Sequence, residues 1–546
     1  MHAAEEIRED MPDMTDWALP SVLSARARHH ADRIFVETVE GETLTYAEAQ
    51  QQAAQVAGFL HGLGVEPGDR VVVMLANGLD FIRIWTGLAR LGAIMVGINT
   101  ELKGPMLQSQ LLRSGAKIAL TGGACGAFLA EALPDVPAIR TVVGTDDIAG
   151  LVPADVSVVA FAGWRQAEPY GGPPPSPRDI ACIVYTSGTS GPAKGVLLPH
   201  AHCYLVGFGM VDNCFMDEND VYYVTLPLFH VNGLFMQVYA TLIAGGKVIL
   251  RERFSASAWL DDIIGHGVTL TGVVGAIISF IFAQPATGKD RAHRLRLIMP
   301  GPNLPEQETI WRERFGIPEV VSAFGMTEAN QYVWGRVGET RPGAAGRAYD
   351  RYFDVRIVDP ETDHELPCGV TGEVVIRPKL PFCFMAGYDG MPEKTAEATR
   401  NLWFHSGDAA YFDADGYLFF VDRLNDRIRR RGENISSFEV EDAMRRLAGV
   451  AEVAAYAVPS GIDGGEDELM LAVVAEPGSA LRVEDIAGFA RSNLPRFAQP
   501  RFIEMVDALP KTNTHKIQKG RLRERGVTAE TFDTLAATAD RAALTR

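Results

Sequence analysis

The sequence predicts an α/β protein: a large N-terminal part with two doubly wound α/β units and a small β-barrel-like unit, then a small α+β unit. Three observations predict this class. The chain of 546 residues is too long for a single hydrophobic core. Apolar strands alternate with amphipathic helices over most of the first 300 residues, as in parallel sheets covered by helices. From Asp354 to Arg377 the pattern changes to short strands separated by turn residues.

Caps and hydrophobic periodicity place the elements of the first unit. Thr45 and Glu48 have the spacing of a capping box, so a helix is expected from there until Gly64 ends it. Apolar runs at 70–75, 93–98 and 117–120 predict strands, and segments 81–91 and 105–113 predict helices. The alternation resumes from Val221 to Met299 and predicts the second α/β unit.

A domain boundary is predicted near residues 423–426, which gives domains of residues 1–424 and 425–546. Beyond the boundary, helices are expected at 438–447 and 483–493, and strands at 453–458 and 469–475. These elements form a compact α+β unit of about 120 residues, within the usual size of a domain.

Composition and charge exclude several classes of function. The formal net charge of −18 argues against a nucleic-acid partner, which calls for a basic face. No apolar run approaches the roughly 20 residues that span a bilayer, and the acidic N-terminus lacks the pattern of a signal peptide. The six cysteines are scattered without a C-x-x-C pair, so we expect reduced thiols, no metal cluster and a cytoplasmic protein.

A stretch rich in glycine and hydroxyl side chains follows the apolar run 181–184 and indicates a phosphate site. Glycines let successive N–H groups face an anion, and Ser and Thr hydroxyls add donors. The stretch is not the P-loop of ATPases, because Gly188 and Gly191 are three apart and Lys194 is followed by Gly195. Its candidate binding residues are Thr186, Ser187, Gly188, Thr189, Ser190, Gly191 and Lys194.

Further segments carry candidate functional residues, and each of these residues, taken alone, is also explained by an ordinary structural role. His230 follows an apolar strand, where a histidine is commonly a core or cap residue, and Glu328, Asp408 and Lys516 can each be a solvated charge. The segments are 226–233 (LPLFHVNG), 323–328 (AFGMTE), 405–408 (HSGD), 421–435 (VDRLNDRIRRRGENI) and 509–519 (LPKTNTHKIQK).

Together with the phosphate stretch, these segments resemble the motifs of the adenylate-forming superfamily of AMP-binding acyl-CoA synthetases, in the family's order. The likeness covers residues 19–523 and is nearest to the crotonobetaine/carnitine-CoA ligase branch. It implies an acid–thiol ligase that uses ATP, Mg²⁺ and coenzyme A. A large N-terminal domain would bind ATP and acid, and a small mobile lid would turn between two half-reactions.

The resemblance also implies a role for each residue. Lys516 would be the catalytic lysine, His230 would gate the thiol, Thr327 would contact phosphate and Glu328 would bind Mg²⁺. Phe324 would stack on adenine, Asp408 and Arg423 would contact the nucleotide, and Gly432 would leave room for pantetheine. Two positions depart from the family pattern: Asn425 stands at the hinge, and His515 replaces the usual glycine. The arginines 427 and 429–431 are either a solvated face or a contact for CoA phosphates.

The same register places the acyl pocket. The expected lining residues are Asn232, Met236, Gly301, Pro302, Gln331, Tyr332 and Trp334. Several of these are large and two carry amides, which predicts a short or medium carboxylic acid with a polar or cyclic body rather than a long alkyl chain. A trimethylammonium group would need an aromatic or acidic cage, and no carboxylate is evident near His230.

Two other functions remain open at this stage. The enzyme could load an acyl group onto a carrier protein, although no carrier domain follows Lys519. Alternatively, the departures from the family pattern at Asn425 and His515 fit a degenerate module that binds ATP or acyl groups and has a regulatory role. The expected partner is a small carboxylic acid, with a homodimer as one assembly, no nucleic acid and no membrane span.

Overall fold

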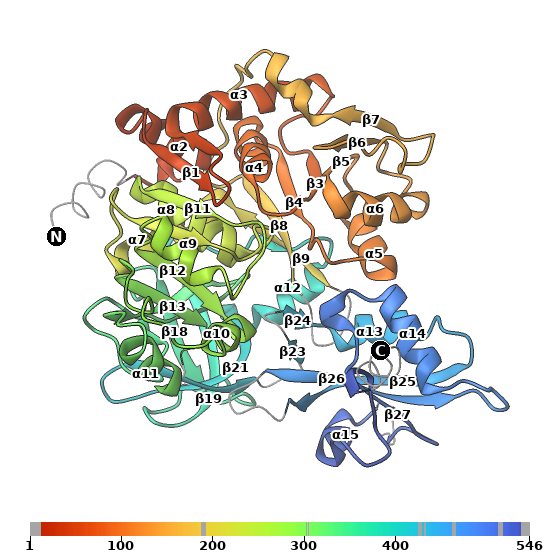
Figure 1. Ribbon diagram of the computed structural model, residues 1–546. Coiled ribbons are helices and arrows are strands. Elements are labelled where there is room, and N and C mark those ends of the chain that lie inside the picture. The colour runs from red at the N-terminus through yellow and green to blue at the C-terminus, as the bar shows by residue number, and fades with distance from the viewer. Residues whose placement is uncertain are drawn as a thin grey trace.

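The computed structural model describes residues 13–186, 193–301, 303, 305–423, 428–430, 433–460, 466–510 and 517–536. Three sheets build the large N-terminal part, and a two-stranded and a four-stranded sheet lie in the small C-terminal part, so the predicted fold class is confirmed (Figure 1). The predicted boundary between residues 424 and 425 lies outside the described residues and stays a prediction. No described helix has the length and apolar character needed to cross a membrane.

The first sheet has eight strands, and its central strands are parallel. In sheet order they are β20 (Gly387–Tyr388), β9 (Lys194–Pro199), β8 (Ile180–Thr186), β4 (Ile94–Gly97), β3 (Arg70–Met74), β5 (Ile118–Thr121), β6 (Thr141–Gly144) and β7 (Ser157–Ala160). The helices of this unit are α3 (Tyr46–Gly62), α4 (Leu79–Leu91), α5 (Gly104–Ser114) and α6 (Gly123–Ala132). The capping box at Thr45 and Glu48 is present, which confirms the predicted start of α3.

The second sheet is parallel except for one edge strand. Its order is β14 (Glu319–Val320), β13 (Leu297–Gly301), β12 (Leu270–Val274), β10 (Val221–Val224), β11 (Lys247–Leu250), β1 (Ile34–Thr38) and β2 (Thr43–Thr45). One face packs in the core with α7 (His200–Cys214), the π-helix η4 (Asn232–Tyr239) and α8 (Ala240–Ala244). The other face is covered by α9 (Trp259–Gly265), α10 (Gly275–Phe282) and α11 (Pro305–Glu313).

The third sheet is antiparallel, as the short strands of the sequence predict. Its order is β15 (Ala323–Met326), β16 (Asn330–Trp334), β17 (Gly346–Ala348), β22 (Tyr417–Arg423), β21 (Phe404–Phe412), β19 (Gly372–Pro378) and β18 (Phe353–Val358). The helix α12 (Pro392–Ala398) lies next to β20.

The C-terminal part holds the hairpin β23 (Ile428–Arg430) and β24 (Glu433–Ile435) and a four-stranded sheet. The sheet consists of β25 (Val450–Pro459), β26 (Asp467–Ala475), β27 (Phe502–Met505) and β28 (Phe532–Asp533). Three helices accompany it: α13 (Ser437–Met444), α14 (Val483–Asn493) and α15 (Lys519–Arg525).

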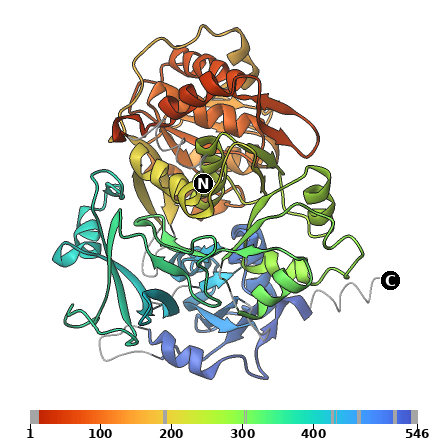
Figure 2. The ribbon, with the colours of Figure 1, turned by 90° about the vertical axis from the view of Figure 1, so that its left-hand side faces the viewer.

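This part packs against α5 of the first unit (Figure 1), and Figure 2 shows the blue C-terminal part at the bottom of the molecule, opposite the red and orange first unit. The Lys103 ammonium, just before α5, donates to the carbonyl of Arg491 near the end of α14 at 2.7 Å. One cluster of buried apolar side chains runs from the β3–β5 region into α13, α14 and the C-terminal sheet. The two parts therefore share apolar as well as polar contacts.

We expect Gly346→Ala to destabilise the protein by about 3 kcal/mol or more, because the change combines a steric clash with backbone strain. Gly346 has φ of 127°, and a Cβ there would lie 2.0 Å from the carbonyl carbon of Trp334. The melting temperature measures the effect. Gly62→Ala, at the end of α3 with no atom within 4 Å of the new Cβ, is the control and should be neutral or slightly stabilising. Equal melting temperatures for the two variants would contradict the close approach at Gly346.

Candidate functional site

The hairpin of β15 and β16 carries Glu328 at its tip, where the sequence predicted a site. The carboxylate is 3% exposed. Its Oε1 accepts from the Thr186 hydroxyl and from the Tyr388 hydroxyl, each at 3.1 Å. Thr186 ends β8, directly before the glycine-rich stretch, so the structure brings two predicted site residues together. Within the described parts of the chain, this buried carboxylate has hydroxyl partners and no ion pair.

Lys194 contacts Tyr388, which is one of the two hydroxyl partners of Glu328. Its Nζ stands 4.4 Å from the centre of the Tyr388 ring, a distance typical of a cation–π contact. Tyr388 reaches this place because β20 pairs with β9, where Tyr388 faces Val196. The next residue, Asp389, is held by a bidentate ion pair with Arg70 of β3, at 2.6 and 2.9 Å. The pair fixes the strand that presents the tyrosine.

His230 lies near the end of β8. The backbone of the preceding Phe229 packs over Gly97, whose strand partner is Val184. The imidazole Nε2 is 3.1 Å from Oε1 of Glu433, which belongs to β24 of the C-terminal part. Burial alone would lower the pKa of His230, and the Glu433 carboxylate outweighs it, so that the pKa lies above its ordinary value. The expectation that no carboxylate lies near His230 is therefore wrong.

The predicted nucleotide residues lie on the third sheet. Phe324 is partly buried, with ring centres 5.7 Å from Tyr332 and 5.5 Å from Phe420 of β22. Asp408 of β21 is 1% exposed, and its N–H donates to the Ser406 hydroxyl at 3.1 Å. Asp408 faces Arg423 across the β21–β22 ladder, so the strands place these two predicted residues side by side.

Two amides of the predicted acyl pocket region meet on the π-helix η4. Gln237 donates to the Asn232 side-chain oxygen at 2.9 Å. Met236 on the same helix is buried, and at Gly301, which ends β13, a Cβ would make an ordinary contact with Val274 at 3.6 Å.

The strand β16 carries the other pocket candidates, and they are not placed alike. Gln331 is half-buried, with its Oε1 beside Gly325. Tyr332 is fully buried. The Trp334 indole packs on Gly209 of α7, and its Nε1 donates to the Gln331 carbonyl at 3.1 Å. Trp334 thus has core partners, and its role in a pocket stays a prediction.

Several predicted residues lie outside the described residues. They are Ser187, Gly188, Thr189, Ser190, Gly191, Pro302, Asn425, Gly432, His515 and Lys516. For Arg423 the backbone alone is described, and Thr327 lies in the turn between β15 and β16.

The structure corrects one further expectation. Arg430 is 4% exposed and pairs with Glu468 at 2.5 Å, so it is neither a solvated residue nor a free contact for phosphate. Three residues of the site were missed: Tyr388, Phe420 and Glu433. Each is at least 60 residues away in the chain from the residue that it contacts. No local pattern in the sequence marks them.

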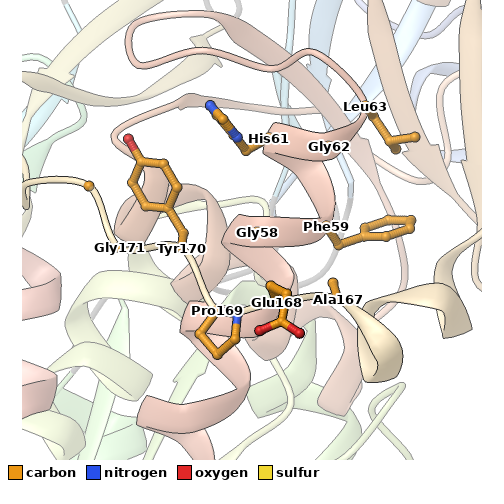
Figure 3. Close-up of a pocket in the computed structure, with 11 residues that line it drawn as sticks. Gly58, Phe59, His61, Gly62, Leu63, Ala167, Glu168, Pro169, Tyr170 and Gly171 are labelled. Atoms are coloured by element: carbon orange, nitrogen blue, oxygen red, sulfur yellow. The ribbon is translucent and has the colours of Figure 1, made fainter.

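A surface pocket of about 650 Å³ lies elsewhere, between the end of α3 and segment 167–172 (Figure 3). The rings of His61 and Tyr170 stand 5.3 Å apart in its wall. None of the predicted site residues lines this pocket. It is therefore separate from the candidate active site.

Comparisons with known proteins agree with the motifs. The family model described as "AMP-binding enzyme" matches residues 23–388, and the "AMP-binding enzyme C-terminal domain" matches residues 439–516. The chain belongs to the AMP-binding enzyme family.

Named relatives refine the comparison. The crotonobetaine/carnitine–CoA ligase of Shigella dysenteriae is 31% identical over 493 residues, which is 88% of this chain and 93% of the relative. ATP-bound MatB from Rhodopseudomonas palustris is 26% identical with a TM-score of 0.68, covering 93% of this chain and 99% of MatB. A double mutant of the o-succinylbenzoate CoA synthetase of Bacillus subtilis, bound to a product analogue, is 23% identical with a TM-score of 0.78. It covers 94% of this chain and 99% of its own, and at this identity it supports the fold alone. The prediction of an enzyme of the acyl-CoA synthetase type is confirmed at the level of the family.

We expect the Glu433→Gln change to abolish a pH-dependent part of the stability. The raised pKa of His230 means that the contact stabilises fully below pH 6.5, the ordinary pKa, and weakens as pH rises through the higher folded value. Wild type should therefore exceed the variant in melting temperature below pH 6.5, by a margin that shrinks at higher pH. The measurement is a pair of melting curves from pH 5.5 to 9.

Glu476→Gln serves as the matched control, because Glu476 is an exposed carboxylate of the same C-terminal part. Its difference from wild type should stay small at every pH. If the Glu433→Gln difference is equally flat, His230 and Glu433 do not form a charge-assisted pair.

Proposed function

We propose that this protein is an ATP-dependent, AMP-forming carboxylate–CoA ligase. The observation that carries the proposal is the buried Glu328 carboxylate, held by Thr186 beside the glycine-rich stretch with the Lys194 ammonium close by. A carboxylate, a hydroxyl and an ammonium in one place suit a metal-bound polyphosphate. The relatives support the same class of enzyme, because they are named as CoA ligases.

The residues present fit a Mg²⁺ ion. A single carboxylate is enough, because Mg²⁺ takes its remaining ligands from water and from substrate phosphates. Glu328 would hold the ion, and Thr186 and Lys194 would contact the phosphate oxygens. When bound, Mg²⁺ would neutralise charge on those oxygens. Tyr388 keeps the carboxylate oriented by its hydroxyl.

The third sheet would bind the rest of the nucleotide. Phe324 would stack on adenine, with the exposed Phe420 ring extending the apolar surface. Asp408 would accept hydrogen bonds from the ribose hydroxyls, and Arg423 would lie beside it.

The reaction would proceed in two steps. First the carboxylate oxygen of the acid attacks the α-phosphorus of ATP, and the bond to pyrophosphate breaks, with Lys516 stabilising the developing charge. Residues 425–546 then turn as a lid, and the thiol sulfur of CoA, having lost its proton, attacks the acyl carbon and releases AMP. The contact of His230 with Glu433 links the thiol gate to the lid. The acid is a short or medium carboxylic acid with a polar or cyclic body, and the enzyme acts in the cytoplasm.

The test is conversion of ATP to AMP with CoA across a broad panel of carboxylic acids. Pyrophosphate release and the mass of the thioester are read together, with a holo-carrier protein as an alternative acceptor. We expect AMP and an acyl-CoA with short or medium polar or cyclic acids. Best turnover on palmitate would contradict the substrate class. Transfer to the carrier protein alone, or binding of ATP without pyrophosphate release, would contradict the ligase.

Lys516→Ala separates the two steps. We expect it to lower adenylate formation by about 10²-fold or more, because a positioned charge is lost from the transition state. Formation of thioester from supplied acyl-adenylate should be retained. The readouts are pyrophosphate release and single-turnover thioester formation, and Lys394→Ala, at an exposed lysine of α12, should leave both unchanged. Equal loss of both half-reactions would contradict the assignment of Lys516 to the first step alone.

A further inference from the structure

Two buried polar side chains next to the predicted acyl pocket have hydrogen-bonding atoms without partners. Gln237 is 1% exposed and Tyr222 is fully buried. Among the described residues, neither Oε1 of Gln237 nor the Tyr222 hydroxyl has a hydrogen-bond partner. Leaving such a group unpaired costs about 1–3 kcal/mol. Two of them side by side therefore call for an explanation other than stability.

The two groups meet over a glycine. A Cβ on Gly272 would lie 2.8 Å from Nε2 of Gln237 and 3.2 Å from the Tyr222 hydroxyl. Gly272 belongs to β12, Tyr222 to the neighbouring β10, and Gln237 to the helix packed on this face. Since any side chain at position 272 would occupy this place, the glycine keeps the amide and the phenol together.

This polar pair continues into the predicted acyl pocket. Strand β13 runs beside β12, with Gly272 facing Met299 and Val274 facing Gly301. Gly272 and Gly301 therefore lie on the same face of the sheet, about 8 Å apart as diagonal neighbours. Among the described residues, a Cβ at Gly301 would make one ordinary contact, with Val274 at 3.6 Å, so a small group fits at the end of β13 without a clash.

The π-helix η4 runs from the predicted pocket residue Asn232 to the polar pair of Gln237 and Tyr222. Asn232 is half-buried at its start, and Gln237 lies one π-turn further in, with its Nε2 bound to the Asn232 oxygen. Segments of π-helix are rare and are frequently found at functional sites. Here the wider turn places two amides on one face, which leads from His230 inward to Tyr222.

The chemistry of the pair identifies what it can bind. An amide and a phenol are uncharged, and burial raises the pKa of the Tyr222 hydroxyl, so it stays a neutral donor. The Tyr222 hydroxyl offers a donor and Oε1 of Gln237 offers an acceptor, which together match a hydroxyl group that both accepts and donates. A quaternary ammonium would find no opposite charge in this pair, and an alkyl end would leave both polar atoms unpaired.

We propose that Gln237 and Tyr222 recognise an uncharged hydroxyl group at the end of the acyl substrate remote from its carboxylate. This assignment rests on the proposed ligase function and narrows its substrate class. It also predicts that acids with a trimethylammonium group are not the substrates of this protein.

The kinetic test compares pairs of acids of equal length. ω-Hydroxyalkanoic acids of four to eight carbons are each set against the alkanoic acid in which a methyl group replaces the hydroxyl, and AMP release gives kcat/KM. At the length that reaches Gly272, wild type should prefer the hydroxy acid by at least about 10-fold, since a site built for a hydrogen bond rejects the analogue without it. Tyr222→Phe and Gln237→Met should each reduce that preference by lowering kcat/KM for the hydroxy acid.

A second test needs no substrate. Removing an unpaired buried hydroxyl should leave the melting temperature of the free protein unchanged or raise it. Tyr46→Phe is the matched control, because Tyr46 is also fully buried and donates to the carbonyl of Gly246 at 2.7 Å. We expect Tyr46→Phe to lower the melting temperature and Tyr222→Phe not to lower it. An equal fall for both would mean that the Tyr222 hydroxyl has a structural partner such as a buried water, and would overturn the proposal.

The outcomes also distinguish this proposal from the ligase function. AMP formation with equal kcat/KM for both acids of every pair overturns the role of Gln237 and Tyr222 and leaves the ligase in place. No AMP with any hydroxy acid, but activity elsewhere in the wider panel, has the same consequence. Failure of the whole panel overturns both.

Discussion

The burial of one carboxylate ties the candidate site together. Glu328 is removed from water, and a buried charge is tolerated only where polar groups surround it. Its hydroxyl partners arrive from β8 and from β20, at Thr186 and Tyr388, while Glu328 itself comes from a hairpin of another sheet. Three segments of the chain therefore converge on one oxygen atom. Because two hydroxyls can satisfy that oxygen without neutralising its charge, the carboxylate keeps an attraction for a cation.

Carboxylates of the C-terminal part also mark its contact with the N-terminal part. Glu433 reaches His230, and Glu439 at the start of α13 accepts from the backbone N–H of Ala193 at 2.7 Å. Ala193 lies directly after the glycine-rich stretch, so a carboxylate uses a donor close to the place expected for phosphate. An anion at this position and a polyphosphate repel each other, which makes the contact more favourable once pyrophosphate has left. The order of the two proposed steps is thereby consistent with the charges in the docked arrangement.

How much of the fold and of the candidate site the sequence predicts depends on how far apart along the chain the interacting residues lie. The cap at Thr45 and most strand positions follow from patterns of three to ten residues, and they agree with the structure within a few residues. Thr186 and Glu328 could be named because their motifs are compact. Tyr388, Glu433 and Gln237 could not, because their importance comes from strand pairing and docking between distant segments. The π-helix likewise gives no signal in hydrophobic periodicity that separates it from an α-helix. The burial of Arg430 was missed for the same reason, since its partner Glu468 lies on another strand.

Buried polar atoms without partners occur at several places among the described residues, and two of them lie next to the predicted acyl pocket. Core positions normally pair every polar atom, yet within the part of the chain that the structure describes Gln237 and Tyr222 hold unpaired atoms beside a glycine. An apolar pair such as Met and Phe would fill the same volume without this cost. Retaining the polar pair is understandable if the missing hydrogen bonds are made by a bound molecule, because the free energy lost in the empty protein then returns as selectivity on binding. The same reasoning applies to Glu328, because its described hydroxyl partners compensate its charge only in part. Both features leave polar atoms that a bound ligand can satisfy.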